Sequence, residues 1–247
     1  MRVALDEAFL LSVIIPIYNE ESTVGEVVDR VAAVPVNKEI IVVDDGSTDR
    51  SVDVLSKRPG QLRVVHESRI NLGKGTAIRI GLTYARGDAI IIQDADLELN
   101  PEEYERLLEA LERGADVVYG SRFLGAGSQN IPSYTIVANR ILTSLTNLLY
   151  GSRLTDMETS YKLVRGAVIR TLALKARRFE FEPELTAKLL LAGYRIVEVP
   201  VTYKPRTKDQ GKKIGWRDGL TAVLVLFKCR LAGGLSTSPR PRRPATR

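Results

Sequence analysis

The sequence predicts an α/β fold in which helices cover both faces of a mostly parallel sheet. Short apolar runs alternate with amphipathic stretches through the first half of the chain, which is typical of strands buried on both faces and of the helices that connect them. The chain has 247 residues, of which 44% are hydrophobic and 27% are charged, as in a globular domain with a large core. Ligands of such sheets bind beyond the carboxyl ends of the strands, so polar residues that follow a strand are candidates for a site.

Each predicted element follows from its own residues. Apolar runs indicate strands, and stretches with apolar residues every three or four positions indicate helices. In the first half we predict strands at residues 11–17, 39–43, 62–65, 89–93 and 116–119, and helices at residues 20–33, 49–57, 74–86 and 101–113. Pro101, directly after Asn100, marks the start of the last of these helices. In the second half we predict helices at residues 136–150, 182–192 and 216–231 and a strand at residues 195–201.

We predict a single domain, because no segment has the composition of a linker between independent units. The domain covers residues 10–231, residues 1–9 form an N-terminal extension, and residues 232–247 form a basic tail that is expected to be disordered. The helix at 136–150 carries an apolar stripe of Val137, Ile141, Leu145 and Leu148. We expect this stripe to face the core.

Composition narrows the class of protein. A single cysteine, Cys229, excludes an internal disulfide framework and fits a reducing compartment. No signal peptide is apparent, and the longest apolar candidate, residues 220–227, is shorter than the ~20 residues that span a bilayer. The net charge of +6 leaves a non-catalytic nucleic-acid-binding protein as an alternative, although carboxylates at a site would repel phosphates in the absence of a metal.

The most informative motif is Asp94-Ala95-Asp96, which follows the apolar run at 89–92. Two carboxylates one residue apart, at the point where a buried strand emerges, can point toward one site. Mg²⁺ and Mn²⁺ commonly bridge such carboxylates to substrate phosphates. An ordinary surface turn is the competing interpretation.

Three further motifs follow other predicted strands. Asp45 could accept a hydrogen bond from a base or ribose, and Tyr18, two residues before Glu20, could pack on a flat base. Lys74 lies between two glycines at a helix start, where the backbone can approach a phosphate. Turn chemistry, helix capping and a solvated lysine are the competing interpretations. Scattered surface residues have no reason to gather at successive strand ends, so the combination favours a functional site.

These motifs resemble those of family-2 glycosyltransferases of the GT-A fold. The resemblance rests on residues 13–20 (VIIPIYNE), 42–49 (VVDDGSTD) and 94–96 (DAD), and it extends through residues 119–123, 155–159 and 211–216. It covers about residues 10–230 and is most similar to the dolichyl-phosphate mannose synthase-like branch. It implies a Rossmann-like GT-A fold in which residues 10–123 bind the nucleotide-sugar and residues 124–231 bind the acceptor.

The resemblance also implies roles for the matching positions. The nucleoside would be held by Pro16, Tyr18, Glu20, Val43 and Asp45. Ala95 and Asp96 would meet the diphosphate and a Mg²⁺ or Mn²⁺ ion, with Asp94 and Glu98 as further metal ligands. Glu98 departs from the family pattern, since the best-known members have Gln there, so its role is open. The glycine-flanked motif of Lys74 predicts that this residue belongs to the same donor site.

Cationic residues would contact the phosphates. The resemblance implies that Arg122 does so from the end of the fifth predicted strand, and that Arg206, Lys212 and Lys213 do so from a loop that closes over the substrates. A solvated charge run is the competing interpretation of that loop. Asp156 falls where related enzymes place a base, so it is a candidate for catalysis or acceptor orientation.

The predicted activity is metal-dependent transfer, with inversion, of a sugar from a nucleotide-sugar to a polyprenyl phosphate. GDP-mannose is the favoured donor and UDP-glucose the second. The protein would be cytoplasmic and peripheral on the cytoplasmic face of a membrane, held there by residues 216–231 and the basic tail or by a membrane-spanning partner protein. The stripe at 136–150 has a secondary interpretation as a guide for the lipid chain. A soluble acceptor is the alternative for the same fold.

Overall fold

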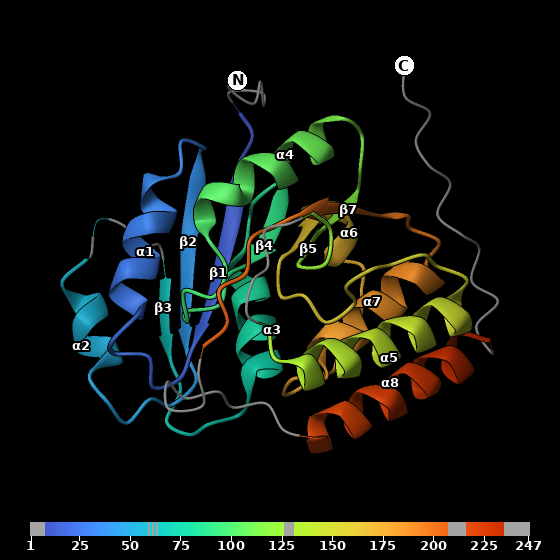
Figure 1. The fold of residues 1–247 in the computed structure, drawn as a ribbon. Helices are drawn as coiled ribbons and strands as arrows, with labels where there is room; N and C mark the ends of the chain where they lie inside the picture. Colours follow the sequence, from blue (N-terminus) through green and yellow to red (C-terminus); the bar gives the residue numbers. More distant parts are fainter. Residues whose placement is uncertain are drawn as a thin grey trace.

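The computed structural model describes residues 8–58, 60, 62, 64–125, 131–206 and 216–234. Within this part of the chain the strands form one seven-stranded sheet in the order β3-β2-β1-β4-β6-β5-β7 (Figure 1). The strands are β1 (Leu11–Ile17), β2 (Lys38–Asp44), β3 (Val64–Glu67), β4 (Ala89–Ile92), β5 (Val117–Ser121), β6 (Lys162–Arg165) and β7 (Ile196–Pro200). Strands from both halves of the sequence therefore share one sheet, as the sequence predicted.

One strand runs against the others. β1 pairs in parallel with β2 and β4, and β2–β3 and β5–β7 are parallel too. β6 pairs antiparallel with both β4 and β5. This strand escaped prediction, because Lys162–Arg165 is only four residues long and has a cation at each end. Its reversal brings the loop before β6 to the edge of the sheet where β4 ends.

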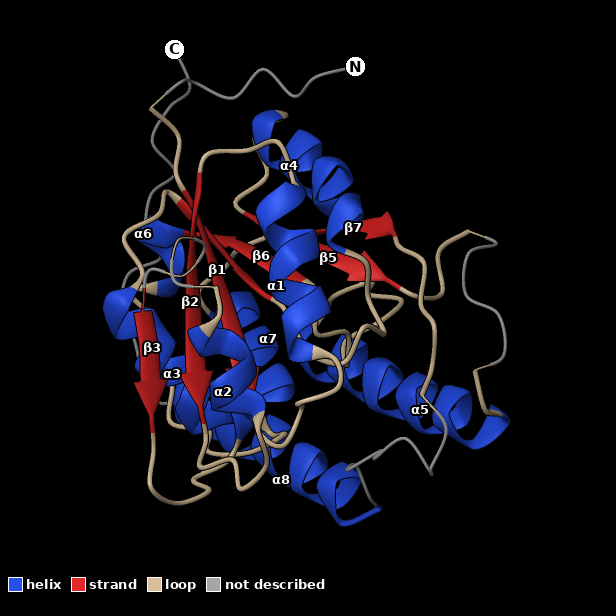
Figure 2. Cartoon of the chain, turned by 90° about the vertical axis from the view of Figure 1, so that its left-hand side faces the viewer, coloured by secondary structure: helices blue, strands red, loops and turns tan. Residues whose placement is uncertain are grey.

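Helices cover both faces of the sheet (Figure 2). On one face lie α1 (Val24–Ala33) and α4 (Tyr104–Glu112), which follows a short 3₁₀ helix, η1 (Pro101–Glu103). On the other lie α3 (Lys74–Tyr84), α6 (Gly166–Ile169) and α7 (Phe181–Leu191), and a short α2 (Ser51–Ser56) packs on α1. Within β1 the side chains alternate: Val13 and Ile15 pack on the α1 side and Ile14 on the α3 side.

Two long helices, α5 (Ser133–Tyr150) and α8 (Trp216–Gly234), lie side by side at one end of the molecule (Figure 1). A third apolar cluster, which includes Leu142, Met157 and Leu226, joins them to α7. No helix in the described residues is long and apolar enough to cross a membrane.

The predicted core stripe of α5 is largely exposed, so that prediction is wrong. Val137, Ile141 and Leu148 are 55%, 61% and 81% exposed, and Leu145 alone of the four packs against the third cluster. The inner side of α5 instead consists of Asn139, Leu142, Thr143 and Thr146. The three polar residues of this set face inward because they form hydrogen bonds. Thr143 Oγ1, for example, accepts from the backbone N–H of Met157. α8 likewise exposes Leu220, Leu224, Phe227 and Leu231.

Candidate active site

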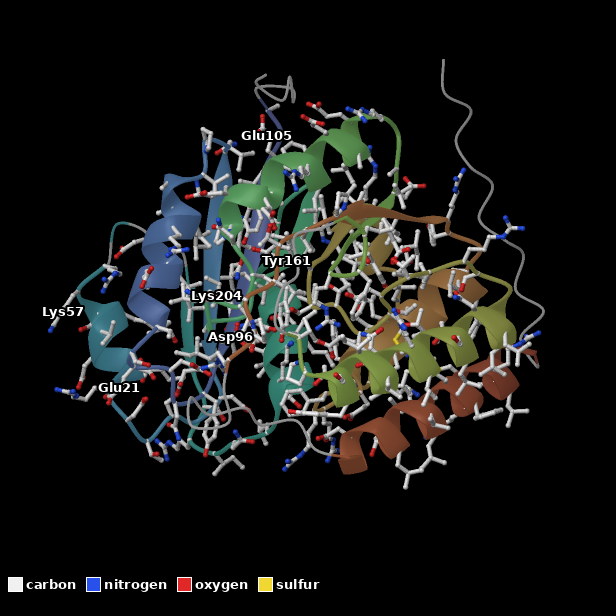
Figure 3. All side chains as sticks on the ribbon, in the orientation of Figure 1. Glu21, Lys57, Asp96, Glu105, Tyr161 and Lys204 are labelled. Atoms are coloured by element: carbon white, nitrogen blue, oxygen red, sulfur yellow. The ribbon has the colours of Figure 1, made fainter. Side chains whose placement is uncertain are left out.

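A cavity of about 980 Å³ lies beyond the carboxyl ends of β1, β2 and β4. Part of its lining comes from these strand ends and from the turn before α3: Pro16, Tyr18, Asp45, Gly73 and Lys74. Another part comes from α5 and α8: Tyr134, Ala138, Leu142, Gly219 and Ala222. Asp94, Ala95 and Asp96 line it as well, and Figure 3 shows Asp96 near the centre of the molecule, close to the segment that carries Lys204. The cavity thus lies where parallel sheets bind ligands.

Asp94 is held by a buried ion-pair chain. Lys74 Nζ lies 2.8 Å from Asp94 Oδ1 and 2.9 Å from Glu182 Oε1 on α7, and the Ser160 hydroxyl also hydrogen-bonds Asp94. Burial opposes ionisation of Asp94, but the Lys74 ammonium outweighs it and lowers the pKa of this carboxyl. Burial likewise disfavours the charged form of Lys74, but its two carboxylate partners raise the pKa of the ammonium. Lys74 therefore neutralises carboxylates at the cavity lining.

Asp96 has the opposite electrostatic environment. Burial, together with the negative charges of Asp94 and Glu98, raises the pKa of Asp96 to about 7. Its Oδ1 accepts a hydrogen bond from the backbone N–H of Glu98, and its Oδ2 lies 3.2 Å from Arg206 Nη2. Leu97, between the two acids, has φ of 59°, a left-handed conformation that costs a non-glycine residue on the order of 1 kcal/mol. The hydrogen bond from the Glu98 N–H to Asp96 holds the turn in this shape.

Arg206 joins the ends of two strands. Its guanidinium contacts Glu20 Oε2 at 2.9 Å, beyond β1, as well as Asp96 beyond β4. Its backbone N–H donates to Glu98 Oε1, and the Tyr203 hydroxyl donates to Glu98 Oε2, both at 2.7 Å. Glu98 thus fastens the segment that carries Arg206. The other two cations predicted for this loop, Lys212 and Lys213, lie outside the described residues.

The predicted nucleoside residues gather at one side of the cavity, with one exception. Asp45 accepts hydrogen bonds from the backbone N–H groups of Leu72 and Gly73, both at 2.7 Å. Gly73 is required there, because its φ is +99° and a Cβ would lie 2.4 Å from the Arg177 carbonyl oxygen. Burial raises the pKa of Asp45. Val43 is the exception: its side chain is buried in the core on the α3 side of the sheet and does not line the cavity.

Arg122 and Asp156 form an ion pair in which Asp156 is fully buried and Arg122 is 12% exposed. Arg122 Nε and Nη2 donate to the two oxygens of Asp156, each at 2.7 Å, and the Arg122 backbone N–H and Asn139 Nδ2 donate to them as well. Burial disfavours the charged form of each group, but the opposite charge of the partner outweighs burial. The pKa of Asp156 is therefore lowered and that of Arg122 is raised. A carboxylate with four donors and a low pKa is a weak proton acceptor.

Two glutamates complete the acidic lining: Glu158, in the loop before β6, and Glu182, on α7. Burial first, and then the negative charge of Glu182, raises the pKa of Glu158 to about 7. Lys162 lies in the same buried cluster, where burial lowers the pKa of its ammonium to about 8. Sequence reasoning did not assign these residues to the site. Glu158 belongs to a quoted motif, but Glu182 had only the appearance of a helix-start residue.

The predicted set of three metal ligands is not assembled. Asp94 is ion-paired with Lys74, and both oxygens of Glu98 accept hydrogen bonds from the 203–206 segment. Among the described residues, no group of three His, Cys, Asp or Glu side chains could hold a metal ion. Mg²⁺, however, is usually bound through one or two carboxylates and the phosphates of a substrate. The buried, negatively surrounded carboxyl of Asp96 fits a metal shared in this way.

The fold and the site define a glycosyltransferase of the GT-A type. The structure matches glucosyl-3-phosphoglycerate synthase from Mycobacterium tuberculosis, crystallised in complex with Mn²⁺, UDP and phosphoglyceric acid, with a TM-score of 0.70 over 90% of this chain and 79% of that one. The sequence identity is 20%, so this likeness shows the fold. The chain belongs to glycosyl transferase family 2, whose family model matches residues 12–172. The predicted fold and enzyme class are confirmed.

The names of two relatives of similar sequence refer to lipid phosphates. The polyprenol monophosphomannose synthase of Mycolicibacterium smegmatis is 32% identical over 214 residues, which are 82% of this chain and 80% of that protein. The undecaprenyl-phosphate 4-deoxy-4-formamido-L-arabinose transferase of Edwardsiella ictaluri is 32% identical over 209 residues. The match covers 82% of this chain but 62% of that relative, so the chain spans less than two thirds of its length.

Proposed function

We propose that the protein transfers a sugar from a nucleotide-sugar to a polyprenyl phosphate, with inversion at the anomeric carbon and with Mg²⁺ or Mn²⁺ as cofactor. The observation that carries the proposal is a single cavity lined both by the strand-end acids and by α5 and α8, the helices with exposed apolar stripes. Such a cavity has room for a charged donor on one side and for a lipid-linked acceptor on the other. GDP-mannose stays the favoured donor, although the names of the relatives include several sugars.

Each end of the donor has residues of suitable chemistry. Tyr18 offers an aromatic face for the base, and the Asp45 carboxylate can accept further hydrogen bonds on lone pairs that Leu72 and Gly73 leave open. Asp96 would hold the metal ion, which when bound would neutralise charge on the diphosphate. Arg206 places a guanidinium 3.2 Å from Asp96, where it can stabilise negative charge that develops on the departing diphosphate.

The proposed reaction is one displacement. An oxygen of the acceptor phosphate bonds to the anomeric carbon, the bond from that carbon to the diphosphate oxygen breaks, and its electron pair leaves with the nucleoside diphosphate. A phosphate is ionised at neutral pH, so no base has to remove a proton from the acceptor. The saturated pair of Asp156 and Arg122 is compatible with this reaction, because it can position the loop before β6 without transferring a proton.

The exposed stripes of α5 and α8 favour contact with a membrane. Ile141 and Leu224 are each 61% exposed, and neighbouring positions on both helices are equally apolar. Contiguous apolar surface of this kind marks interaction sites, and an amphipathic helix can insert its apolar side at the boundary of headgroups and acyl chains. Exposed cations on the same helices, Arg140, Lys228 and Arg230, suit an anionic leaflet. We propose that this end of the molecule lies on the membrane that holds the acceptor.

A double substitution tests the membrane contact. Ile141→Glu with Leu224→Glu is expected to weaken co-sedimentation with vesicles that contain anionic lipid by at least about tenfold, because two apolar side chains no longer enter the bilayer. Ile70→Glu is the matched control, since Ile70 is 64% exposed but lies on neither helix. Equal loss in both variants, or no loss in the double variant, would contradict the contact.

A donor and acceptor panel tests the reaction. The protein is incubated with GDP-mannose, UDP-glucose or UDP-N-acetylglucosamine, and with polyprenyl phosphate or 3-phosphoglycerate, in Mn²⁺, Mg²⁺ or a chelator. We expect a lipid-linked sugar of inverted configuration, formed only with metal. Product on the soluble acceptor alone would overturn the lipid assignment. Absence of turnover together with salt-sensitive duplex binding would favour the nucleic-acid alternative.

A further inference from the structure

The loop before β6 contains a buried carboxylate oxygen that has no hydrogen-bond partner. Glu158 Oε1 is the one such side-chain atom in the part of the chain that the structure describes. A buried acceptor without a donor is destabilising, so native structures rarely retain one unless a ligand or other function requires it. Glu158 also lines the cavity of the proposed site. The oxygen itself is shielded from solvent, so a donor for it would have to come from a ligand bound tightly against the Glu158 side chain in that cavity.

The position of Glu158 is fixed from both sides. Lys162 Nζ donates to the carbonyl oxygens of Met157, at 2.8 Å, and of Thr159, the two neighbours of Glu158. The Met157 N–H donates to Thr143 on α5, and the Thr159 hydroxyl donates to the carbonyl of Gly120 on β5. A loop tied to a helix, a strand and a buried lysine is preorganised, as a recognition site requires. The open acceptor thus belongs to a rigid part of the molecule.

The neighbouring charges decide what kind of ligand fits. The acids near Glu158 have partners of their own: Asp156 is paired with Arg122, and Glu182 with Lys74. An anionic group beside Glu158 would be repelled by the Glu158 carboxylate itself, and the cations nearby already have partners: Arg122 is paired with Asp156, and Lys162 donates to backbone carbonyl oxygens. A metal ion is disfavoured as well, because the neighbouring acids that would have to share it are already ion-paired. An uncharged hydrogen-bond donor, such as a hydroxyl group, is the ligand chemistry that remains.

The place of Glu158 in the cavity identifies that hydroxyl. The Ser160 hydroxyl, two residues further on, hydrogen-bonds Asp94, next to the proposed diphosphate site at Asp96. Tyr18 and Asp45, which would bind the nucleoside, lie beyond the ends of β1 and β2 instead. The group attached to the far end of the diphosphate is the sugar. We propose that Glu158 accepts a hydrogen bond from a hydroxyl of the sugar being transferred and thereby selects the donor. This inference rests on the proposed function.

Substitutions combined with deoxy-sugar donors test the inference. Glu158→Ala removes the acceptor, and Glu158→Gln keeps one carbonyl oxygen while it removes the charge. Kinetics are measured with the preferred nucleotide-sugar and with its monodeoxy analogues, and binding of the nucleoside diphosphate alone is measured by calorimetry. The wild type is expected to lose about 10- to 100-fold in kcat/KM on the analogue that lacks the contacted hydroxyl. Glu158→Ala should show a similar loss in kcat/KM with the parent sugar, because it lacks the acceptor. It should lose little more when the analogue replaces the parent sugar, and Glu158→Gln should lie between the wild type and Glu158→Ala.

Glu184→Gln is the matched control. Glu184 is a buried glutamate on α7 that accepts from the backbone N–H groups of Lys175 and Ala176 and does not line the cavity. The Glu184→Gln variant should discriminate among the donors as the wild type does, even if its free energy of unfolding is lower. An equal loss of Glu158→Ala on every analogue, or an equal loss in binding of the nucleoside diphosphate alone, would overturn the assignment of Glu158. If the wild type binds nucleotide-sugars but transfers no sugar to a lipid, the proposed function is wrong. In that case the binding affinities of the deoxy-sugar donors for the wild type and Glu158→Ala still test the role of Glu158.

Discussion

Asp156 and Glu158 are two residues apart in one loop, yet their environments are opposite. Both oxygens of Asp156 accept hydrogen bonds from Arg122, one of them also from Asn139, and the pKa of this carboxyl is lowered. Glu158 has an oxygen without a partner, and its pKa is raised to about 7. The difference shows that burial alone does not decide the charge state of an acid. The donors and charges around the carboxylate do.

Loss of the structural acid should have the largest effect. Asp156→Asn is expected to lower the free energy of unfolding by about 3 kcal/mol at pH 7, because it leaves the buried Arg122 guanidinium without its anion. The folded-state pKa of Asp156 lies below its unfolded value, so its stabilisation is present above about pH 4 and is lost as the pH falls through the folded value. Urea unfolding at several pH values should show the two proteins converging in acid.

The control for this variant is Asp116→Asn. Asp116 pairs with Arg165 at the surface, and both side chains are 37% exposed. Surface pairs contribute about 0–1 kcal/mol, so this change should be close to neutral. A similar destabilisation in both variants would show that burial of the Asp156 pair has no special importance.

Asp96 belongs with Glu158, since its pKa is also raised to about 7. Asp96→Asn is expected to lower transfer about 100-fold, because it removes the proposed metal ligand, while the free energy of unfolding does not fall, since burial and Asp94 already oppose ionisation of Asp96. Calorimetry should show that Mn²⁺ no longer strengthens binding of the nucleoside diphosphate, whereas metal-free binding is retained. Unchanged metal dependence would remove Asp96 from the metal site, and Asp116→Asn again serves as the control.

The smallest effect is a gain in stability. Ionisation of Glu158 costs stability increasingly from its unfolded pKa near 4.5 up to its folded pKa of about 7, because burial and Glu182 oppose its charge while Lys162 and Arg122 offset only part of this cost. Glu158→Gln should therefore match the wild type in unfolding free energy near pH 4 and exceed it at pH 8, by a margin that grows between these two pH values. Denaturant unfolding at both pH values measures this, and a loss of stability at pH 8 would contradict the difference between the two acids.

Sequence patterns predicted the parts of the molecule that depend on local order. The apolar runs located six of the seven strands in the described residues, and the acids that follow them, Asp45 and Asp96, line one cavity because parallel strands end at the same edge. Lys74 was placed at the cavity too, but its partner Glu182 lies 108 positions further on, and no local pattern connects the two.

The errors have a common physical cause. α5 has an apolar stripe and a polar one, and periodicity alone assigns the apolar stripe to the core. In the structure the polar stripe is inside, because Asn139 and Thr143 hold Asp156 and Met157 in the loop before β6. The short, charged β6 could not be recognised for a related reason, since its pairing partners are distant in sequence. Long-range partners decide both cases.

The reversal of β6 has a consequence for how donor preference can change. In a parallel sheet the loop after a strand reaches the site, but here the loop before β6 does, between two strands of the nucleotide half. Residues 155–161 therefore form a short segment that reaches the site from the middle of the sheet, whereas Tyr18 and Asp45 reach it from the ends of β1 and β2. If Glu158 contacts the sugar as proposed, exchange of this segment between relatives that use different sugars is expected to change the sugar preference and leave the preference for the nucleotide base in place.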